Sequence, residues 1–109
     1  MPDNAEQSGP YKVGRLAVVN EQIRQMGQRA KLLGIRQEIE DALLAVVAKL
    51  ESEPLTWGDP QYATRHPGGL VLRGLRFPLI VRYAAFEHER AVILLDLRVF
   101  PGHPLGGEP

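Results

Sequence analysis

The chain has 109 residues, 44% of them hydrophobic and 24% charged, with 13 basic and 13 acidic side chains. This length and composition predict one ordinary globular domain, and the absence of cysteine excludes disulfides, thiolate metal sites and cysteine nucleophiles. No apolar run approaches the roughly 20 residues that a membrane helix needs, and the first residues lack a signal-peptide pattern. We therefore expect a cytoplasmic protein without a membrane segment, a cofactor or a metal.

The two ends of the chain are expected to be flexible tails. Residues 1–10 are polar with two prolines, and residues 101–109 are rich in glycine and proline, so neither segment can bury much surface. One domain is then expected over residues 11–100. Within it, residues 11–19 end in Leu-Ala-Val-Val and predict a first strand.

Two amphipathic helices are predicted next. The first begins at Asn20, a residue type that caps helix N-termini, and ends at Gly34, which can adopt a left-handed conformation. Its apolar face comprises Ile23, Met26, Ala30 and Leu33. The second helix ends before Pro54, and its apolar residues recur every three or four positions. They are Ile35, Ile39, Leu43, Val46 and Leu50. With only Gly34 between them, the helices should form a hairpin.

The second half of the chain predicts a loop and three strands. Residues 53–69 contain three prolines and three glycines and are expected to form a loop. The strands are expected over residues 70–77, 79–86 and 91–100, with a hairpin between the last two. The predicted fold is α+β, a helical hairpin on a mostly antiparallel sheet, in the order β-α-α-β-β-β.

Alternation along the last strand predicts which side chains are buried. Its core face comprises Ala91, Ile93, Leu95, Leu97 and Val99, while Asp96 and Arg98 lie on the other face. Pairing about His88 places Tyr83 opposite Ile93 and Arg82 diagonal to Asp96, away from the helices. The residues expected in the core are Ile39, Leu43, Val46, Tyr83, Ile93, Leu95 and Leu97.

The order of elements resembles one family, and short motifs agree with it. Leu50 to Pro54, followed by residues 58–60, is similar to the stretch after that family's helical hairpin. Residues 78–84 and 91–97 are similar to its Arg-x-x-Tyr strand and the strand that follows. The family is the RelE/ParE superfamily of toxins from type II toxin–antitoxin systems, and the resemblance covers nearly all of residues 11–100.

The resemblance implies either of two activities. One branch consists of ribosome-dependent, metal-independent mRNA endonucleases, which are associated with plasmid stabilisation; the other consists of non-enzymatic inhibitors of DNA gyrase. The implied partners are a cognate antitoxin and either the ribosome with its mRNA or gyrase. The chain departs from the nuclease pattern twice: Ile80 stands at the motif's arginine position, and residues 100–103 replace the C-terminal tyrosine region. An inactive interaction module with the same fold is the third hypothesis.

The candidate site residues are mostly arginines. Residues 63–85 contain four arginines and a histidine but no acidic side chain, so a positively charged face is expected there. Arginine remains charged and holds phosphate groups closely, as phosphoryl chemistry requires. The candidate catalytic residues are Arg73, Arg76, Arg82, Arg98 and His103. The candidate nucleic-acid-binding residues are Arg65, His66, Arg73 and Arg76. The alternatives are a solvated sheet surface for the arginines, and a disordered tail or a solvated loop for the histidines.

Overall fold

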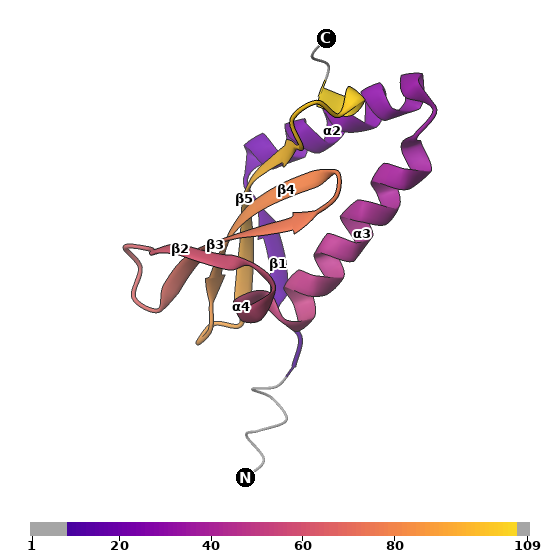
Figure 1. Ribbon diagram of the computed structural model, residues 1–109. Helices are drawn as coiled ribbons and strands as arrows, with labels where there is room; N and C mark the ends of the chain where they lie inside the picture. The colour runs from indigo at the N-terminus through magenta and orange to yellow at the C-terminus, as the bar shows by residue number, and fades with distance from the viewer. Residues whose placement is uncertain (1–8, 107–109) are drawn as a thin grey trace.

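The computed structural model describes residues 9–106 and shows an α+β fold, as the sequence predicts (Figure 1). Two long helices pack on one side of a five-stranded sheet. The elements in chain order are β1 (Lys12–Arg15), α2 (Ala17–Leu33), α3 (Arg36–Ser52), α4 (Pro54–Trp57), β2 (Asp59–Ala63), β3 (Gly69–Arg76), β4 (Leu79–Phe86), β5 (Ala91–Val99) and the 3₁₀ helix η1 (Pro104–Gly106).

The helical hairpin forms where the apolar periodicity predicts it. Gly34 has φ 74° and ends α2, because a residue without a side chain adopts the left-handed conformation at no steric cost. The periodic face of α3 is buried at Ile39, Val46 and Leu50. The helix ends at Ser52, before Pro54, whose ring cannot continue an α-helix but begins the short α4.

The first strand is shorter than the sequence predicts. It ends at Arg15, and α2 begins at Ala17, so the prediction of a strand to residue 19 is wrong. The Val-Val pair belongs to the helix, where Val19 is fully buried in the core. Asn20 therefore lies inside α2 and does not cap it; its side-chain oxygen accepts a hydrogen bond from the Arg15 guanidinium instead.

The strands are ordered β1-β5-β4-β3-β2, with β1 parallel to β5 and the other neighbours antiparallel. The predicted loop over residues 53–69 is wrong for most of its length, because α4 and β2 form within it. The Tyr83 hydroxyl anchors this segment: it donates a hydrogen bond to the Pro54 carbonyl (2.5 Å) and accepts one from the Gly58 amide (3.0 Å). The Trp57 ring stacks on Tyr83 with the ring centroids 5.8 Å apart, as expected for an aromatic anchor.

The register between β4 and β5 also differs from the prediction. Tyr83 pairs with Leu94 and Arg82 with Asp96, so Leu95 is an extra residue in a β-bulge. The bulge changes the phase of the alternation along β5. Leu94 is consequently 5% exposed and belongs to the core, whereas Ile93 and Leu95 are only partly buried and lie outside the core cluster.

The other predicted core residues are confirmed, and the segment after β5 contributes one further residue to the core. Ile39, Val46, Tyr83 and Leu97 are buried, and Leu43 packs against the core. In η1, Leu105 is 2% exposed, so residues 104–106 differ from the expected tail. Residues 1–8 of the N-terminal tail expected over residues 1–10, and the last three residues of the C-terminal tail, lie outside the described part of the chain. Within residues 9–106, no helix has the length and apolarity needed to cross a bilayer.

Candidate functional site

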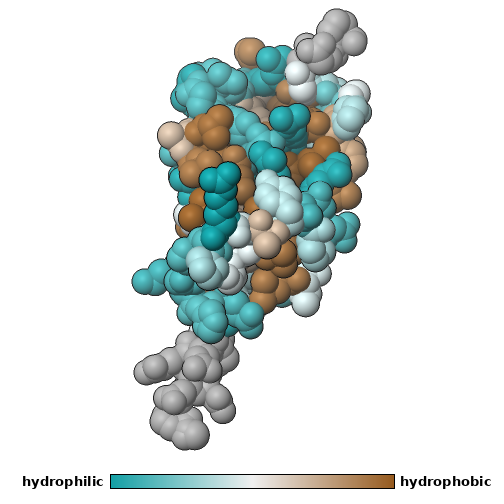
Figure 2. Space-filling model, turned by 90° about the vertical axis from the view of Figure 1, so that its left-hand side faces the viewer, coloured by the Kyte–Doolittle hydropathy of each residue, from teal (hydrophilic) through white to brown (hydrophobic). Residues whose placement is uncertain are grey.

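A row of four charged residues crosses the sheet at its centre. Asp59 pairs with Arg73, Arg73 with Arg82, and Arg82 with Asp96, so the row reads acid, arginine, arginine, acid. Their strand neighbours Leu72 and Tyr83 are buried in the core beneath the helices. Because side chains alternate along a strand, Arg73 and Arg82 lie on the opposite, helix-free face. Figure 2 views the molecule from the side opposite α3, where hydrophilic groups lie between apolar patches.

The helix-free face contains a hollow of about 530 Å³. Three arginines surround it, two from the central row and Arg98 from the end of β5. The full lining comprises Gln61, Arg73, Ile80, Arg82, Asp96, Arg98, Val99 and Pro101. We call this set the arginine hollow. It brings together Arg73, Arg82 and Arg98, three of the five residues that the sequence nominates for catalysis.

The arginine hollow carries a surplus of positive charge. Asp96 accepts hydrogen bonds from Gln22 Nε2 (3.0 Å) and Arg98 Nε (2.7 Å). Burial favours the neutral acid, but these hydrogen bonds and the charges of Arg98 and Arg82 outweigh it, and they lower the pKa of Asp96. Neither Arg73 nor Arg82 forms an ion pair with any residue in the range 9–106. One carboxylate therefore lines the hollow with three guanidinium groups.

Three other predicted residues lie away from this hollow. Arg76 is three positions from Arg73 on the same strand, so alternation directs it to the other face. Arg65 and His66 lie in the connection between β2 and β3. His66 Nε2 lies 3.1 Å from Glu89 Oε2, and this hydrogen bond lowers the pKa of Glu89. The nucleic-acid-binding set predicted from the sequence is thus divided among separate surfaces.

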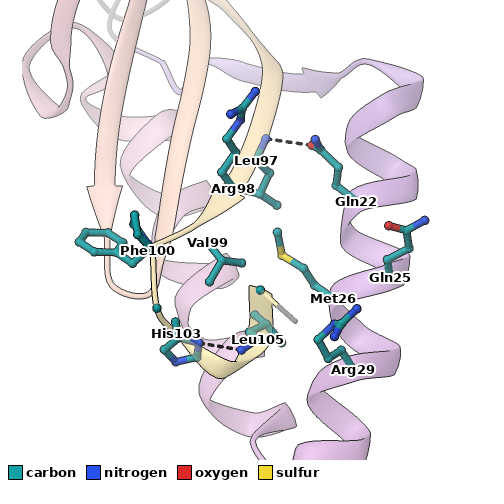
Figure 3. A pocket seen from close by; sticks show the side chains of 13 residues that line it. Gln22, Gln25, Met26, Arg29, Leu97, Arg98, Val99, Phe100, His103 and Leu105 are labelled. Atoms are coloured by element: carbon teal, nitrogen blue, oxygen red, sulfur yellow. Dashed lines mark hydrogen bonds between the residues drawn. The ribbon is translucent and has the colours of Figure 1, made fainter. Parts of the chain in front are cut away.

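His103 lies in a second depression, between α2 and the end of β5 (Figure 3). This groove has a volume of about 360 Å³, and Met26 and Val99 point into it from opposite sides. The His103 Nδ1 atom accepts a hydrogen bond from the Leu105 amide (3.1 Å). His103 does not line the arginine hollow, although Arg98, Val99 and Pro101 contribute to both depressions.

The arginine hollow is suited to binding an anion. Its lining contains no histidine, tyrosine or glutamate, and the lowered pKa of Asp96 keeps that carboxyl group ionised at neutral pH. Within residues 9–106 no cluster of three histidine, aspartate or glutamate side chains could hold a metal ion. The geometry therefore provides several fixed cations and one weakly basic carboxylate.

Sequence reasoning missed two side chains of this site. Gln22 holds Asp96 and also accepts a hydrogen bond from the Leu97 amide (2.9 Å), at the part of β5 that extends beyond β1. Nothing local in the sequence indicates this contact, because the two residues are 74 positions apart. Gln61 lines the hollow from β2, and it was missed because the prolines around it favoured a loop.

No family model, curated protein or solved structure matches this chain.

Proposed function

We propose that the protein is a RelE/ParE-like toxin that binds RNA phosphates in the arginine hollow. The observation that carries this proposal is the direct pairing of Arg73 with Arg82 on the helix-free face. Like charges directly opposite one another destabilise a sheet, and neither guanidinium forms a close ion pair among residues 9–106, although Asp59 and Asp96 flank the two arginines in the row. A phosphate between them replaces this repulsion with charge-assisted hydrogen bonds.

The local charge supports an anionic ligand although the chain as a whole is neutral. The formal net charge is zero, so non-specific attraction to nucleic acid is weak and the surplus in the hollow decides where an anion binds. Arg98 extends the cationic surface towards the end of β5. Three guanidinium groups in one hollow match a segment of RNA backbone better than a single small anion.

Ribosome-dependent cleavage of mRNA is the first form of this function. Arg73, Arg82 and Arg98 would then stabilise the negative charge that develops on the scissile phosphate. Such cleavage also needs a group that transfers protons. The hollow offers only Asp96, while His103 lies in the neighbouring groove. This division supports a second candidate function, a non-enzymatic inhibitor of gyrase or another protein partner, in which the arginines would contact that partner and no RNA would be cleaved.

A cognate antitoxin belongs to either form of the proposal. An acidic, extended segment of such a partner would compete with RNA for Arg73 and Arg82. If the proposal is correct, a small gene next to the gene of this protein should encode the antitoxin, a DNA-binding protein.

Induced expression in a bacterial host, combined with mapping of transcript ends, tests the proposed function. We expect growth arrest with wild type, and none with Arg73→Glu/Arg82→Glu, because each phosphate contact becomes a repulsion. Arg76→Glu is the matched control, since it changes the charge on the other face of the same strand. Codon-aligned cleavage identifies the nuclease, and DNA damage identifies the gyrase inhibitor. Arrest that persists in the double variant, or no arrest with wild type, contradicts the proposal.

A further inference from the structure

Three aromatic rings meet at the end of the sheet beside the arginine hollow. Phe77, in the turn between β3 and β4, contacts Phe100 with the ring centroids 5.2 Å apart and an interplanar angle of 66°. It also contacts His103, with a centroid distance of 5.5 Å and an angle of 79°. Phe77 therefore packs against two rings, each nearly perpendicular to its own, in the edge-to-face geometry that aromatic pairs favour.

Phe77 remains exposed despite these contacts. Its exposed fraction is 61%, higher than that of most apolar side chains in the described residues. A phenylalanine that contacts two neighbouring rings and is still open to solvent offers part of its ring surface to a ligand. The two contacts restrict rotation of the side chain, which lowers the conformational entropy lost when a flat ligand binds.

The aromatic cluster is continuous with the cationic surface. Phe100 stands between Val99 and Pro101, and both of these residues line the arginine hollow. The Phe100 amide donates a hydrogen bond to the Pro78 carbonyl (2.9 Å), which holds the chain after β5 against the turn that carries Phe77. Residues 99–101 thus join the hollow to the turn that carries Phe77.

We propose that Phe77 is a stacking platform for a nucleobase of single-stranded RNA whose phosphates lie in the arginine hollow. This inference rests on the proposed function and adds its substrate form, an unpaired strand. Proteins that bind single strands combine a cationic groove with aromatic rings, and stacking tolerates any base because every base has a π-face. A duplex keeps its bases stacked inside and cannot offer one to Phe77.

Binding of two labelled oligonucleotides, measured by fluorescence anisotropy, tests the platform. One is a single-stranded RNA of ten nucleotides, and the other has the same backbone with abasic residues. We expect wild type to prefer the RNA, and Phe77→Leu to weaken RNA binding by roughly tenfold while leaving abasic binding unchanged. Phe77→Trp should retain the preference. Leu75→Ala, at an apolar side chain of the same hairpin that is 55% exposed, controls for general apolar contact.

The outcomes separate this inference from the function on which it rests. Equal binding of both oligonucleotides by wild type, or an unchanged RNA affinity for a folded Phe77→Leu, overturns the platform while the phosphate site stands. If Leu75→Ala weakens RNA binding as much as Phe77→Leu does, the platform is also overturned, since the aromatic ring would then contribute no more than any apolar side chain. Failure of both oligonucleotides to bind overturns the proposed function and the platform together.

Discussion

Replacement of Tyr83 by phenylalanine removes one hydroxyl group from the centre of the fold. The side chain is fully buried, and its hydroxyl links the two ends of α4 to β4 through Pro54 and Gly58. Phenylalanine retains the ring and its stacking on Trp57, so the variant tests the two hydrogen bonds alone.

The expected loss follows from the two groups that the hydroxyl satisfies. Without it, the Pro54 carbonyl and the Gly58 amide lose their partner, and a buried polar group left unpaired costs about 1–3 kcal/mol. Allowing for relaxation of α4, we expect the free energy of unfolding to fall by about 2–3 kcal/mol. For a domain of this size that corresponds to a decrease in Tm of roughly 10 °C.

Denaturant and thermal unfolding of wild type, Tyr83→Phe and Tyr62→Phe measure this effect. Tyr62 is the matched control, because it is 55% exposed and its hydroxyl makes no hydrogen bond with residues 9–106. A Tyr83→Phe variant within about 0.5 kcal/mol of wild type, the range of an ordinary surface substitution, would refute the anchoring role of the hydroxyl.

The same hydroxyl predicts an alkaline limit to stability. Burial raises the pKa of Tyr83 to about 12; the hydrogen bond from Gly58 opposes this and the charge of Asp59 adds to it. In the unfolded chain the pKa is about 10, so the folded state favours the neutral phenol more strongly than the unfolded state does. The resulting stability is present below pH 10 and is lost as pH rises through the folded pKa. Between about pH 10 and 12, the free energy of unfolding of Tyr83→Phe should therefore fall less with rising pH than that of wild type.

Four further substitutions test the packing, the bulge and the charge of the site. Gly74→Ala should lower stability by about 1–3 kcal/mol, since the new Cβ would overlap the Trp57 ring, and the tryptophan fluorescence should shift as the ring moves. Leu94→Asp should unfold the domain, whereas Leu95→Asp at the bulge should leave it folded by circular dichroism; the opposite result would restore the simple alternation. Asp96→Asn should tighten RNA binding in a titration, because it removes the carboxylate of the arginine hollow, and unchanged or weaker binding would contradict that reasoning.

The sequence predicts the elements that depend on local periodicity. The face of α3, the left-handed end of α2 at Gly34 and the limits of β4 follow from spacing and backbone preference alone, and the structure confirms them. The errors arise where a distant contact overrides a local signal. Prolines around β2 favour a loop, but pairing with β3 and the hydroxyl of Tyr83 hold that segment in place.

The candidate site shows the same division. Arg73 and Arg82 share a face because of the register between β3 and β4, which depends on the turn at residues 77–78. The bulge in β5, which places Asp96 opposite Arg82, has no local signal in the sequence. The separation of Arg76 from Arg73 could have been predicted, since an interval of three places two strand residues on opposite faces. The contact between Gln22 and Asp96 had no sequence signal, because it joins a helix to the far end of the chain.

The salt dependence of RNA binding tests the central claim most directly. If Arg73, Arg82 and Arg98 each hold a phosphate of a single strand, the logarithm of the binding constant should fall with the logarithm of salt concentration with a slope of about −2. Arg73→Ala/Arg82→Ala should reduce the slope to about −0.7. Arg76→Ala, on the other face, should keep the wild-type slope. A double variant that binds with the slope and affinity of wild type would contradict the assignment of the arginine hollow as the phosphate site.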